Sequence, residues 1–322
     1  MATKDSWVEK YRPEKLDDIY SQNIIINSLK VAINNKNIPH LIFYGPSGSG
    51  KTSTILALAK DIFGQDYNDR IIEFNASDER GINIIRDKIK IYAKYSIKNI
   101  DKSPSWKIII LDEADTMTND SQFALRRIME QYSKITRFCI TCNNYNKIIE
   151  PINSRCALFR FKAINNNDML LKLNFICNKE NINCSNELIN NIINISKGDL
   201  RKGINLLQQI CTMYNVNVIA SNKFLNELSG IIPIDLLNNL MNNLFNKNIN
   251  EVCILIQEIY NNGYSLVNQI LPIHNFILNS HLSSKQKASI IYKLVEIDNF
   301  LLNGCDEYIQ FVNLIYFIMI NI

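Results

Sequence analysis

Residues 45–52 read Gly45-Pro46-Ser47-Gly48-Ser49-Gly50-Lys51-Thr52, and this stretch decides the fold. It matches the pattern G-x-x-x-x-G-K-[ST] of a loop that binds nucleotide phosphates. An apolar run at 41–44 precedes it and a helical pattern at 53–60 follows, which is the strand–loop–helix context that the motif requires. Glycines let backbone N–H groups turn toward phosphate oxygens, and a helix N-terminus adds positive potential. The sequence therefore predicts a P-loop nucleoside triphosphatase and not a chance match in an ordinary loop.

The last residues of the motif carry its chemistry. Lys51 is expected to reach the β- and γ-phosphates of ATP, and the Thr52 hydroxyl is expected to ligate Mg²⁺. The residues of this loop that we expect to bind the nucleotide are Gly45, Pro46, Ser47, Gly48, Ser49, Gly50, Lys51, Thr52 and Ser53.

A second motif ends in acidic residues. Four consecutive apolar residues at 108–111 are typical of a buried parallel strand, and Asp112 and Glu113 follow directly. Because such sheets carry their chemistry at the carboxyl ends of the strands, Asp112 is expected to hold Mg²⁺, directly or through water. Glu113 is expected to polarise the attacking water as a general base. The alternative is a solvated acidic turn, which the pairing with the phosphate loop disfavours.

A third apolar strand leads to Asn143. An amide at this position is placed to orient the attacking water or to contact the γ-phosphate. Asn is abundant throughout this chain, so an ordinary Asn in the turn after a strand is an equal alternative.

Composition and charge set broad limits on the protein class. The chain has 322 residues, enough for two or three domains, and its 47% hydrophobic and 20% charged residues indicate a globular protein. The formal net charge of +4 neither requires nor excludes nucleic acid as a partner. Residues 1–6 lack an apolar signal core, and the apolar stretch 314–320 is too short to span a bilayer. We therefore expect a soluble, intracellular protein with no membrane partner.

The eight cysteines are scattered along the chain, which favours a reducing compartment and free thiols. Cys139 and Cys142 form a C-x-x-C, but an odd spacing on a strand points the two side chains to opposite faces. No second pair follows, and the three histidines are distant in sequence. The sequence therefore disfavours a zinc or redox site.

The chain changes character near residue 162. Strands are expected near 41–45, 71–76, 107–112, 137–143 and 157–162, and they alternate with helices. This alternation predicts an α/β domain with a parallel sheet over residues 1–162. Helical periodicity follows, including a helix from Leu200 to Met213, and predicts a small helical domain over 163–222. A last all-helical domain is expected over 223–322, with helices separated near 261–263, 281–284 and 303–304.

Several further motifs resemble one family, the small subunits of replication factor C, which are AAA+ clamp-loader ATPases. The resemblance covers nearly the whole chain, and its motifs lie at residues 7–13, 39–41, 75–82, 124–127, 154–156 and 198–201. Three C-terminal segments, at 282–287, 293–298 and 306–307, favour one paralogue among the small subunits. The family has Pro and Thr where this chain has Ser47 and Ser49, and we expect these changes to affect the loop only slightly.

The resemblance implies an AAA+ P-loop fold, in which 163–222 is a lid and 223–322 is a collar that holds a hetero-pentamer together. Such an assembly binds ATP between subunits, opens a sliding clamp, places it on primer–template DNA in the nucleus, and hydrolyses ATP to release it. A structural subunit that binds ATP with little turnover is the alternative function. The string at 112–115 also invites comparison with helicases, but no second RecA-like half follows.

Further nucleotide-site residues follow from the resemblance alone. Four are expected to line the adenine side of the pocket, in addition to any packing on the sheet: Val8, Tyr11, Arg12 and Pro13. Asn75 is expected to act as a switch that holds Glu113 away until DNA binds, with a turn Asn as the alternative. Arg201 is expected to sense the γ-phosphate from the lid.

The resemblance also makes Arg155 an arginine finger, which would neutralise charge on the ATP of the neighbouring subunit. Without the resemblance, Arg155 is a surface residue in a loop before a strand. Arg155 is therefore the residue that links this site to an assembly.

Contacts with DNA and with the clamp are expected along one helix, from about Ile82 to Tyr95. Arg80, Arg86 and Lys90 are expected to bind DNA phosphates, which carry no sequence information. Arg86 and Lys90 are four residues apart and share a face, and a solvated basic face is the alternative. The far end of the helix is expected to contact the clamp through Tyr95 and Ile97, unless Tyr92 and Ile97 belong to the core.

Overall fold

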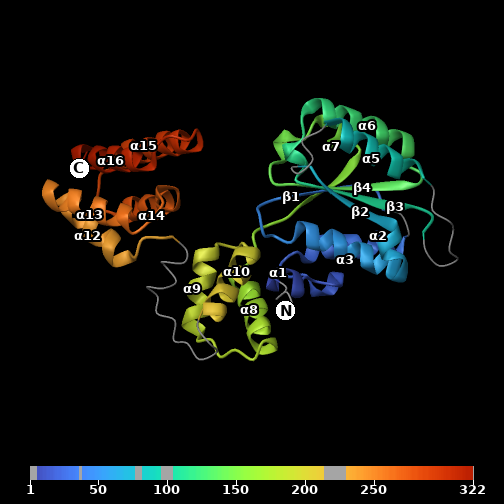
Figure 1. Ribbon diagram of the computed structural model, residues 1–322, viewed down its shortest axis with the longest axis horizontal. Helices are drawn as coiled ribbons and strands as arrows, with labels where there is room; N and C mark the ends of the chain where they lie inside the picture. Colours follow the sequence, from blue (N-terminus) through green and yellow to red (C-terminus); the bar gives the residue numbers. More distant parts are fainter. Residues whose placement is uncertain (1–5, 36–37, 77–81, 96–103, 214–229, 322) are drawn as a thin grey trace. The chain divides into compact units, whose positions relative to one another are not determined.

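The computed structural model describes residues 6–35, 38–76, 82–95, 104–213 and 230–321, with the backbone alone for 82–86 and 213. The chain divides into two compact units, at residues 1–218 and 219–322. The first contains a sheet with helices, and the described part of the second is all helical (Figure 1). The finer domain boundaries at 162/163 and 222/223 stay predictions.

The sheet of the first unit has five strands. They are β1 (His40–Tyr44), β2 (Ile71–Asn75), β3 (Lys107–Asp112), β4 (Thr136–Cys142) and β5 (Cys156–Arg160). Their order is β2-β3-β4-β1-β5, and all neighbouring pairs are parallel. The predicted strands and the parallel sheet are thus confirmed, with small shifts at the strand ends. The apolar runs were informative because parallel strands that are buried on both faces are apolar throughout.

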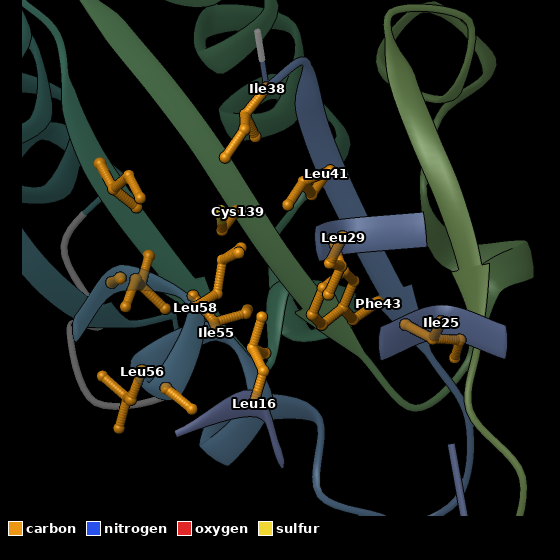
Figure 2. Close-up of a cluster of buried hydrophobic side chains, with 14 of the residues drawn as sticks. Leu16, Ile25, Leu29, Ile38, Leu41, Phe43, Ile55, Leu56, Leu58 and Cys139 are labelled. Carbon is orange, nitrogen blue, oxygen red and sulfur yellow. The ribbon is translucent and has the colours of Figure 1, made fainter. Parts of the chain in front are cut away.

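Helices cover both faces of the sheet, and the alternation of side chains along each strand produces two cores. Leu41 and Phe43 of β1 pack in one core with side chains of α2 (Asn23–Asn34) and α3 (Lys51–Phe63), as Figure 2 shows. Ile42 points the other way, into a second core. That core is completed by α5 (Ile82–Lys94), α6 (Asn119–Tyr132) and α7 (Glu150–Asn153).

The remaining helices of this unit are short or belong to the predicted lid. The short ones are α1 (Trp7–Lys10), η1 (Leu16–Asp18), η2 (Gly64–Asp66), α4 (Tyr67–Arg70), η3 (Ala114–Thr116) and η4 (Tyr145–Lys147). Three longer helices follow the sheet: α8 (Asn166–Lys179), α9 (Asn186–Ser196) and α10 (Leu200–Met213). The bounds of α10 agree with the prediction.

The second unit contains α12 (Ile234–Phe245), α13 (Ile249–Asn261), α14 (Leu266–Asn279), α15 (Ser284–Leu302) and α16 (Glu307–Asn321). Their apolar faces share one buried cluster, which includes Leu240, Ile256, Ile273 and Leu314. The three predicted helix breaks are confirmed. Among the residues described, the helices lack the combination of length and apolarity that crossing a membrane requires.

His40, at the start of β1, couples the stability of the first unit to pH. The residue is buried, and its Nδ1 accepts a hydrogen bond from the Phe138 backbone N–H at 3.1 Å, which requires an unprotonated Nδ1. Burial, with a smaller contribution from the charge of Arg137, lowers the pKa of His40 from 6.5 to about 4. Between these two values the unfolded chain binds more protons than the folded chain. This contribution to stability is therefore complete above pH 6.5 and is lost as the pH falls toward 4.

We expect His40 to remove roughly 2–3 kcal/mol from the free energy of unfolding between pH 7 and pH 4.5. His40→Asn keeps an acceptor for the Phe138 N–H without a titrating group and should flatten this part of the pH profile. The measurement is denaturant unfolding followed by tryptophan fluorescence, since Trp7 and Trp106 both lie in the first unit. The exposed His281 supplies the control His281→Asn. An unchanged pH slope in His40→Asn would contradict the assignment.

Candidate active site

A pocket lies at the edge of the sheet where β1, β3 and β4 end. The parallel arrangement brings the segments that follow these strands together, and the N-terminal segment and the predicted lid complete the walls. The lining residues are Val8, Tyr11, Arg12, Pro13, Ile19, Tyr20, residues 47–53, Asp112, Glu113, Thr141, Cys142, Asn143, Ile164, Lys172, Leu200, Arg201 and Ile204. The other residues predicted to bind the nucleotide therefore line one pocket. Gly45 and Pro46 do not line it, but their carbonyl oxygens accept hydrogen bonds from Lys51.

Lys51 is held at the first turn of α3 by three acceptors. Its Nζ donates to the carbonyl oxygens of Gly45 (2.8 Å) and Pro46 (2.9 Å) and to Oδ1 of Asn143 (2.8 Å). Burial lowers the pKa of Lys51, and the nearby carboxylate of Asp112 acts in the opposite direction. The ammonium is thus positioned at the pocket with polar partners that anionic oxygens of a ligand can replace.

Thr52 and Asp112 form a pair of oxygen donors beside Lys51. The Thr52 hydroxyl donates to Oδ2 of Asp112 at 2.9 Å, and Thr141 on β4 donates its hydroxyl to Oδ1 of the same carboxylate. Adjacent ligands of an octahedral Mg²⁺ with bonds of about 2.1 Å lie about 3.0 Å apart. The two oxygens therefore have the hardness and the separation that two neighbouring magnesium ligands need.

Glu113 has an unusual backbone conformation. Its φ of 53° and ψ of 40° lie in the left-handed region, which side chains other than Gly adopt at a cost of about 1–2 kcal/mol. Its N–H is directed to Oδ1 of Asp112 (3.1 Å) and to the Thr141 hydroxyl (3.3 Å). The turn leaves the Glu113 side chain exposed at the pocket wall.

Asn143, directly after β4, contacts both Lys51 and Asp115. In addition to accepting from Lys51, it is held by its backbone N–H, which donates to Oδ1 of Asp115 at 3.4 Å. The neighbouring Asn144 N–H donates to Oδ2 of Asp115 at 3.2 Å. The carboxylate after β3 thus fixes the segment after β4, and the amide of Asn143 faces the phosphate loop.

The phosphate loop contacts the start of helix α10. Gly48 has a φ of +64°, and a Cβ at this position would lie 1.8 Å from Oδ1 of Asp199, so the backbone conformation and the close approach both favour glycine. The Leu200 N–H donates to the Gly48 carbonyl at 3.3 Å. Ser49 is buried and donates its hydroxyl to the Pro46 carbonyl at 2.8 Å. Arg201, one residue after Leu200, lines the pocket, and its charge lowers the pKa of Lys51.

The N-terminal segment forms hydrogen bonds with Glu180, which directly follows helix α8. The Tyr11 hydroxyl and Lys10 Nζ both donate to Oε1 of Glu180 at 2.5 Å. Arg12 donates to Oε1 of Glu9 at 2.7 Å. The segment that brings Val8, Tyr11, Arg12 and Pro13 to the pocket thus also packs on the predicted lid.

Arg155 lies away from the pocket. It immediately precedes β5, whereas the phosphate loop follows β1, and the two strands are parallel neighbours. The five residues of β5 therefore separate these two edges of the sheet by about 16 Å. Arg155 donates to the Pro151 carbonyl at 2.6 Å and forms an ion pair with Glu130 of α6 at 2.5 Å.

The predicted switch and DNA residues lie on or near β2 and α5. Asn75 is paired in register with Asp112 at the end of the neighbouring strand. Arg80 lies outside the described residues, Arg86 is described by its backbone alone on α5, and Lys90 is exposed on the same helix. The roles of these residues stay predictions.

The end of α5 bears on the predicted clamp contact. Tyr95 is 67% exposed, and Tyr92 is partly buried against the core. Ile97 lies outside the described residues. The exposed ring of Tyr95 is thus available to a partner, whereas Tyr92 contributes to the core.

Cys139 and Cys142 contribute to the two different cores, as their odd spacing predicted. Burial raises the pKa of both thiols, that of Cys142 to about 12. Within the described ranges, no group of three or more His, Cys, Asp or Glu side chains is arranged to hold a metal.

Sequence reasoning missed part of the pocket wall. The missed residues are Ile19, Tyr20, Thr141, Cys142, Ile164, Lys172, Leu200 and Ile204. Thr141 could have been found from the sequence, because residues two apart on a strand share a face and Asn143 was already a candidate. Lys172 had none, because a lysine in a helical pattern is normally read as solvated.

Family models match three consecutive parts of the chain. Residues 41–163 match the ATPase family associated with various cellular activities (AAA). Residues 171–212 match the RCF1/5-like AAA+ ATPase lid domain, and residues 232–316 match the replication factor C C-terminal domain. The fold and the pocket thus belong to the class of AAA+ P-loop ATPases.

Full-length relatives narrow the class to a family. Replication factor C subunit 2 of Saccharomyces cerevisiae is 41% identical, over 96% of this chain and 91% of the relative. Replication factor C subunit 4 of Homo sapiens is 38% identical, over 96% of this chain and 86% of the relative. The chain therefore belongs to the replication factor C family. The segments at 282–287, 293–298 and 306–307 favour this same paralogue, which is named subunit four in human and subunit two in yeast.

A solved structure supports the fold independently. The RuvB Holliday junction branch migration motor of Thermotoga maritima matches with a TM-score of 0.55 at 13% identity. The match covers 73% of this chain and 79% of the RuvB chain. At this identity the similarity concerns the fold alone.

Proposed function

We propose that this chain binds and hydrolyses ATP as a small subunit of a replication factor C clamp loader in the nucleus. The assembly, a hetero-pentamer, would load a sliding clamp onto primer–template DNA during replication and repair. One observation carries the ATPase part of this proposal: the end of the Lys51 side chain, the Thr52 hydroxyl and the Asp112 carboxylate meet in one pocket with Asn143. These are the group types that phosphate and Mg²⁺ binding require.

Lys51, Thr52 and Asp112 would hold the triphosphate end of the nucleotide. The backbone of residues 45–50 and the Lys51 ammonium would bind phosphate oxygens, in place of the carbonyl and amide acceptors that Lys51 has here. Thr52 and Asp112 would hold Mg²⁺, which when bound neutralises part of the phosphate charge. Ser53 lies in the first turn of α3, where the N–H groups point toward an anion.

Glu113, Asn143 and Arg201 would act on the reacting groups. Glu113 would accept a proton from the attacking water, and its left-handed backbone supports this role, because strained conformations cluster at functional sites. Asn143 would orient the water or the γ-phosphate, and Arg201 would contact the γ-phosphate from α10. Asn75, beside Asp112 on the sheet, would restrain Glu113 until DNA binds.

Arg155 would act on the nucleotide of a neighbouring subunit. Its position at the opposite edge of the sheet from its own phosphate loop supports action in trans, since a guanidinium must reach the γ-phosphate to stabilise the transition state. This residue makes catalysis depend on assembly.

DNA and clamp binding would use helix α5 and the segments beside it. Arg80, Arg86 and Lys90 would contact DNA phosphates, which suits recognition of a primer–template junction by shape. Tyr95 and Ile97 would contact the clamp, and the exposure of Tyr95 supports its part.

Lys51→Met is expected to weaken ATP binding by about 100-fold or more, because the ammonium has three donors and each charged hydrogen bond contributes about 1.5–3 kcal/mol. Lys60→Met is the matched control on the same helix, where Lys60 pairs with Glu14 and lies outside the pocket. Fluorescent ATP titration checks both variants, and circular dichroism checks their folding. Unaltered affinity in a folded Lys51→Met protein would refute the nucleotide site.

The alternative function is a structural subunit that holds ATP with little turnover. The pocket retains Glu113, Asn143 and Arg201 beside the binding residues, which supports hydrolysis instead. Purification of the tagged chain with its partners, followed by mass spectrometry, tests the assembly. Recovery of four related subunits and a sliding clamp supports the proposal, and recovery of the chain alone counts against it.

A further inference from the structure

Lys172 of α8 is a buried lysine in the wall of the pocket. It is only 6% exposed, yet it lines the same cavity as the phosphate loop. Its Nζ lies over the rings of Tyr20, at 5.8 Å from the centroid, and Phe175, at 5.3 Å. These contacts hold the ammonium by its charge and leave its N–H groups available as hydrogen-bond donors.

The hydrogen-bonding capacity of this ammonium is unused within the described part of the chain. No acceptor there receives a hydrogen bond from Lys172. The charge of Asp18 acts on the pKa of Lys172, but Asp18 is too far from Nζ for an ion pair. Burial lowers the pKa of Lys172. The ammonium lines the pocket without a protein acceptor among the described residues, so a ligand that supplies one there would gain a charged hydrogen bond.

Lys172 belongs to the aromatic end of the pocket. Tyr20 and Tyr11 line this end, and Tyr11 packs edge-on against Phe175 with centroids 6.3 Å apart. The charges that act on Lys51 include those of Asp112, Asp115 and Arg201, whereas the charge that acts on Lys172 is that of Asp18. The two lysines therefore serve different ends of one pocket, and flat aromatic and aliphatic walls suit a base more than phosphates.

We propose that Lys172 donates a hydrogen bond from Nζ to a ring nitrogen of the purine base and so determines how tightly the base is held. This inference rests on the proposed function, because it assumes that the phosphates occupy the loop at 45–52. An ammonium carries donors only, so it recognises the acceptor nitrogens of a purine and not an exocyclic amino group.

Lys172→Met tests this role against a matched control on the same helix. Met retains most of the side-chain volume without the donors. We expect it to weaken ATP binding about 10- to 100-fold, while binding of inorganic tripolyphosphate, which has no base, stays unchanged. Lys179→Met is the control, because Lys179 also lies over Phe175, at 5.7 Å, but is exposed outside the pocket. Lys179→Met should bind both probes as the unaltered chain does.

Deaza analogues of ATP identify the acceptor on the unaltered protein, so the test does not depend on a variant that folds. We expect one of 1-deaza-, 3-deaza- and 7-deaza-ATP to bind about tenfold or more weakly than ATP. Lys172→Met should not distinguish that analogue from ATP. Equal affinity for all three analogues, or equal losses for ATP and tripolyphosphate in Lys172→Met, would overturn the assignment. An unaltered chain that binds neither ATP nor tripolyphosphate would instead refute the proposed function.

Discussion

Glu113→Gln is expected to lower ATP hydrolysis at this subunit's site by about 10²–10⁴-fold, the usual contribution of a general base, and to leave ATP affinity nearly unchanged. The amide keeps the size of the side chain but cannot accept the proton of the attacking water. The side chains proposed to hold the nucleotide keep their contacts in this variant, because Lys51 contacts Asn143 and Thr52 contacts Asp112. Binding and turnover should therefore separate in this variant.

Single-turnover hydrolysis in the reconstituted assembly measures the effect on Glu113→Gln. Glu150→Gln is the matched control, since it makes the same chemical change at an exposed residue of α7 outside the pocket. Equal rates of hydrolysis at this site in Glu113→Gln and Glu150→Gln would show that Glu113 is not the general base.

Arg155→Ala is expected to lower hydrolysis at the neighbouring subunit's site by about 10³–10⁵-fold, the range measured for arginine fingers. The residue precedes β5, at the opposite edge of the sheet from its own phosphate loop. Its guanidinium is held by the Pro151 carbonyl and the Glu130 carboxylate, so it is presented in a defined position. Removing it should leave the chain's own affinity for ATP unchanged.

Site-specific measurement in the assembly separates action in trans from action in cis. ATP binding is measured on the isolated chain, and hydrolysis is measured in assemblies in which only the neighbour retains a working site. Arg160→Ala, an exposed arginine at the other end of β5, is the control. A collapse of the isolated chain's own ATP affinity in Arg155→Ala would show that Arg155 acts in cis.

The sheet and its chemistry could be predicted because its strands are short apolar runs, and three of these runs lead into functional motifs. The phosphate loop with Lys51 follows the run of β1, Asp112 ends β3 and Asn143 follows β4, and parallel strands bring these ends together. The strand order could not be predicted in this way, because it depends on how α2, α3, α5 and α6 pack on the two faces. Tertiary packing, not local pattern, decides that order.

The rest of the pocket wall depends on contacts between residues far apart in sequence. Thr141 binds Asp112 across neighbouring strands, and Gly48 meets Asp199 from the start of α10. The left-handed turn at Glu113 also has no local sequence signal, since Glu has no preference for that region. The roles of Arg155 and Arg201 came from the family resemblance. The structure adds that Arg201 lines the chain's own pocket, whereas Arg155 lies outside it.

The steady-state rate of ATP hydrolysis by the reconstituted assembly, measured with and without a sliding clamp and primer–template DNA, tests the central claim most directly. The account predicts that clamp and DNA together stimulate turnover, and that Lys51→Met in this subunit alone removes this site's share of the stimulated rate. A rate that is indifferent to clamp and DNA would contradict a clamp-loading ATPase. A stimulated rate that is unaffected by Lys51→Met would show that this subunit's pocket does not contribute to hydrolysis.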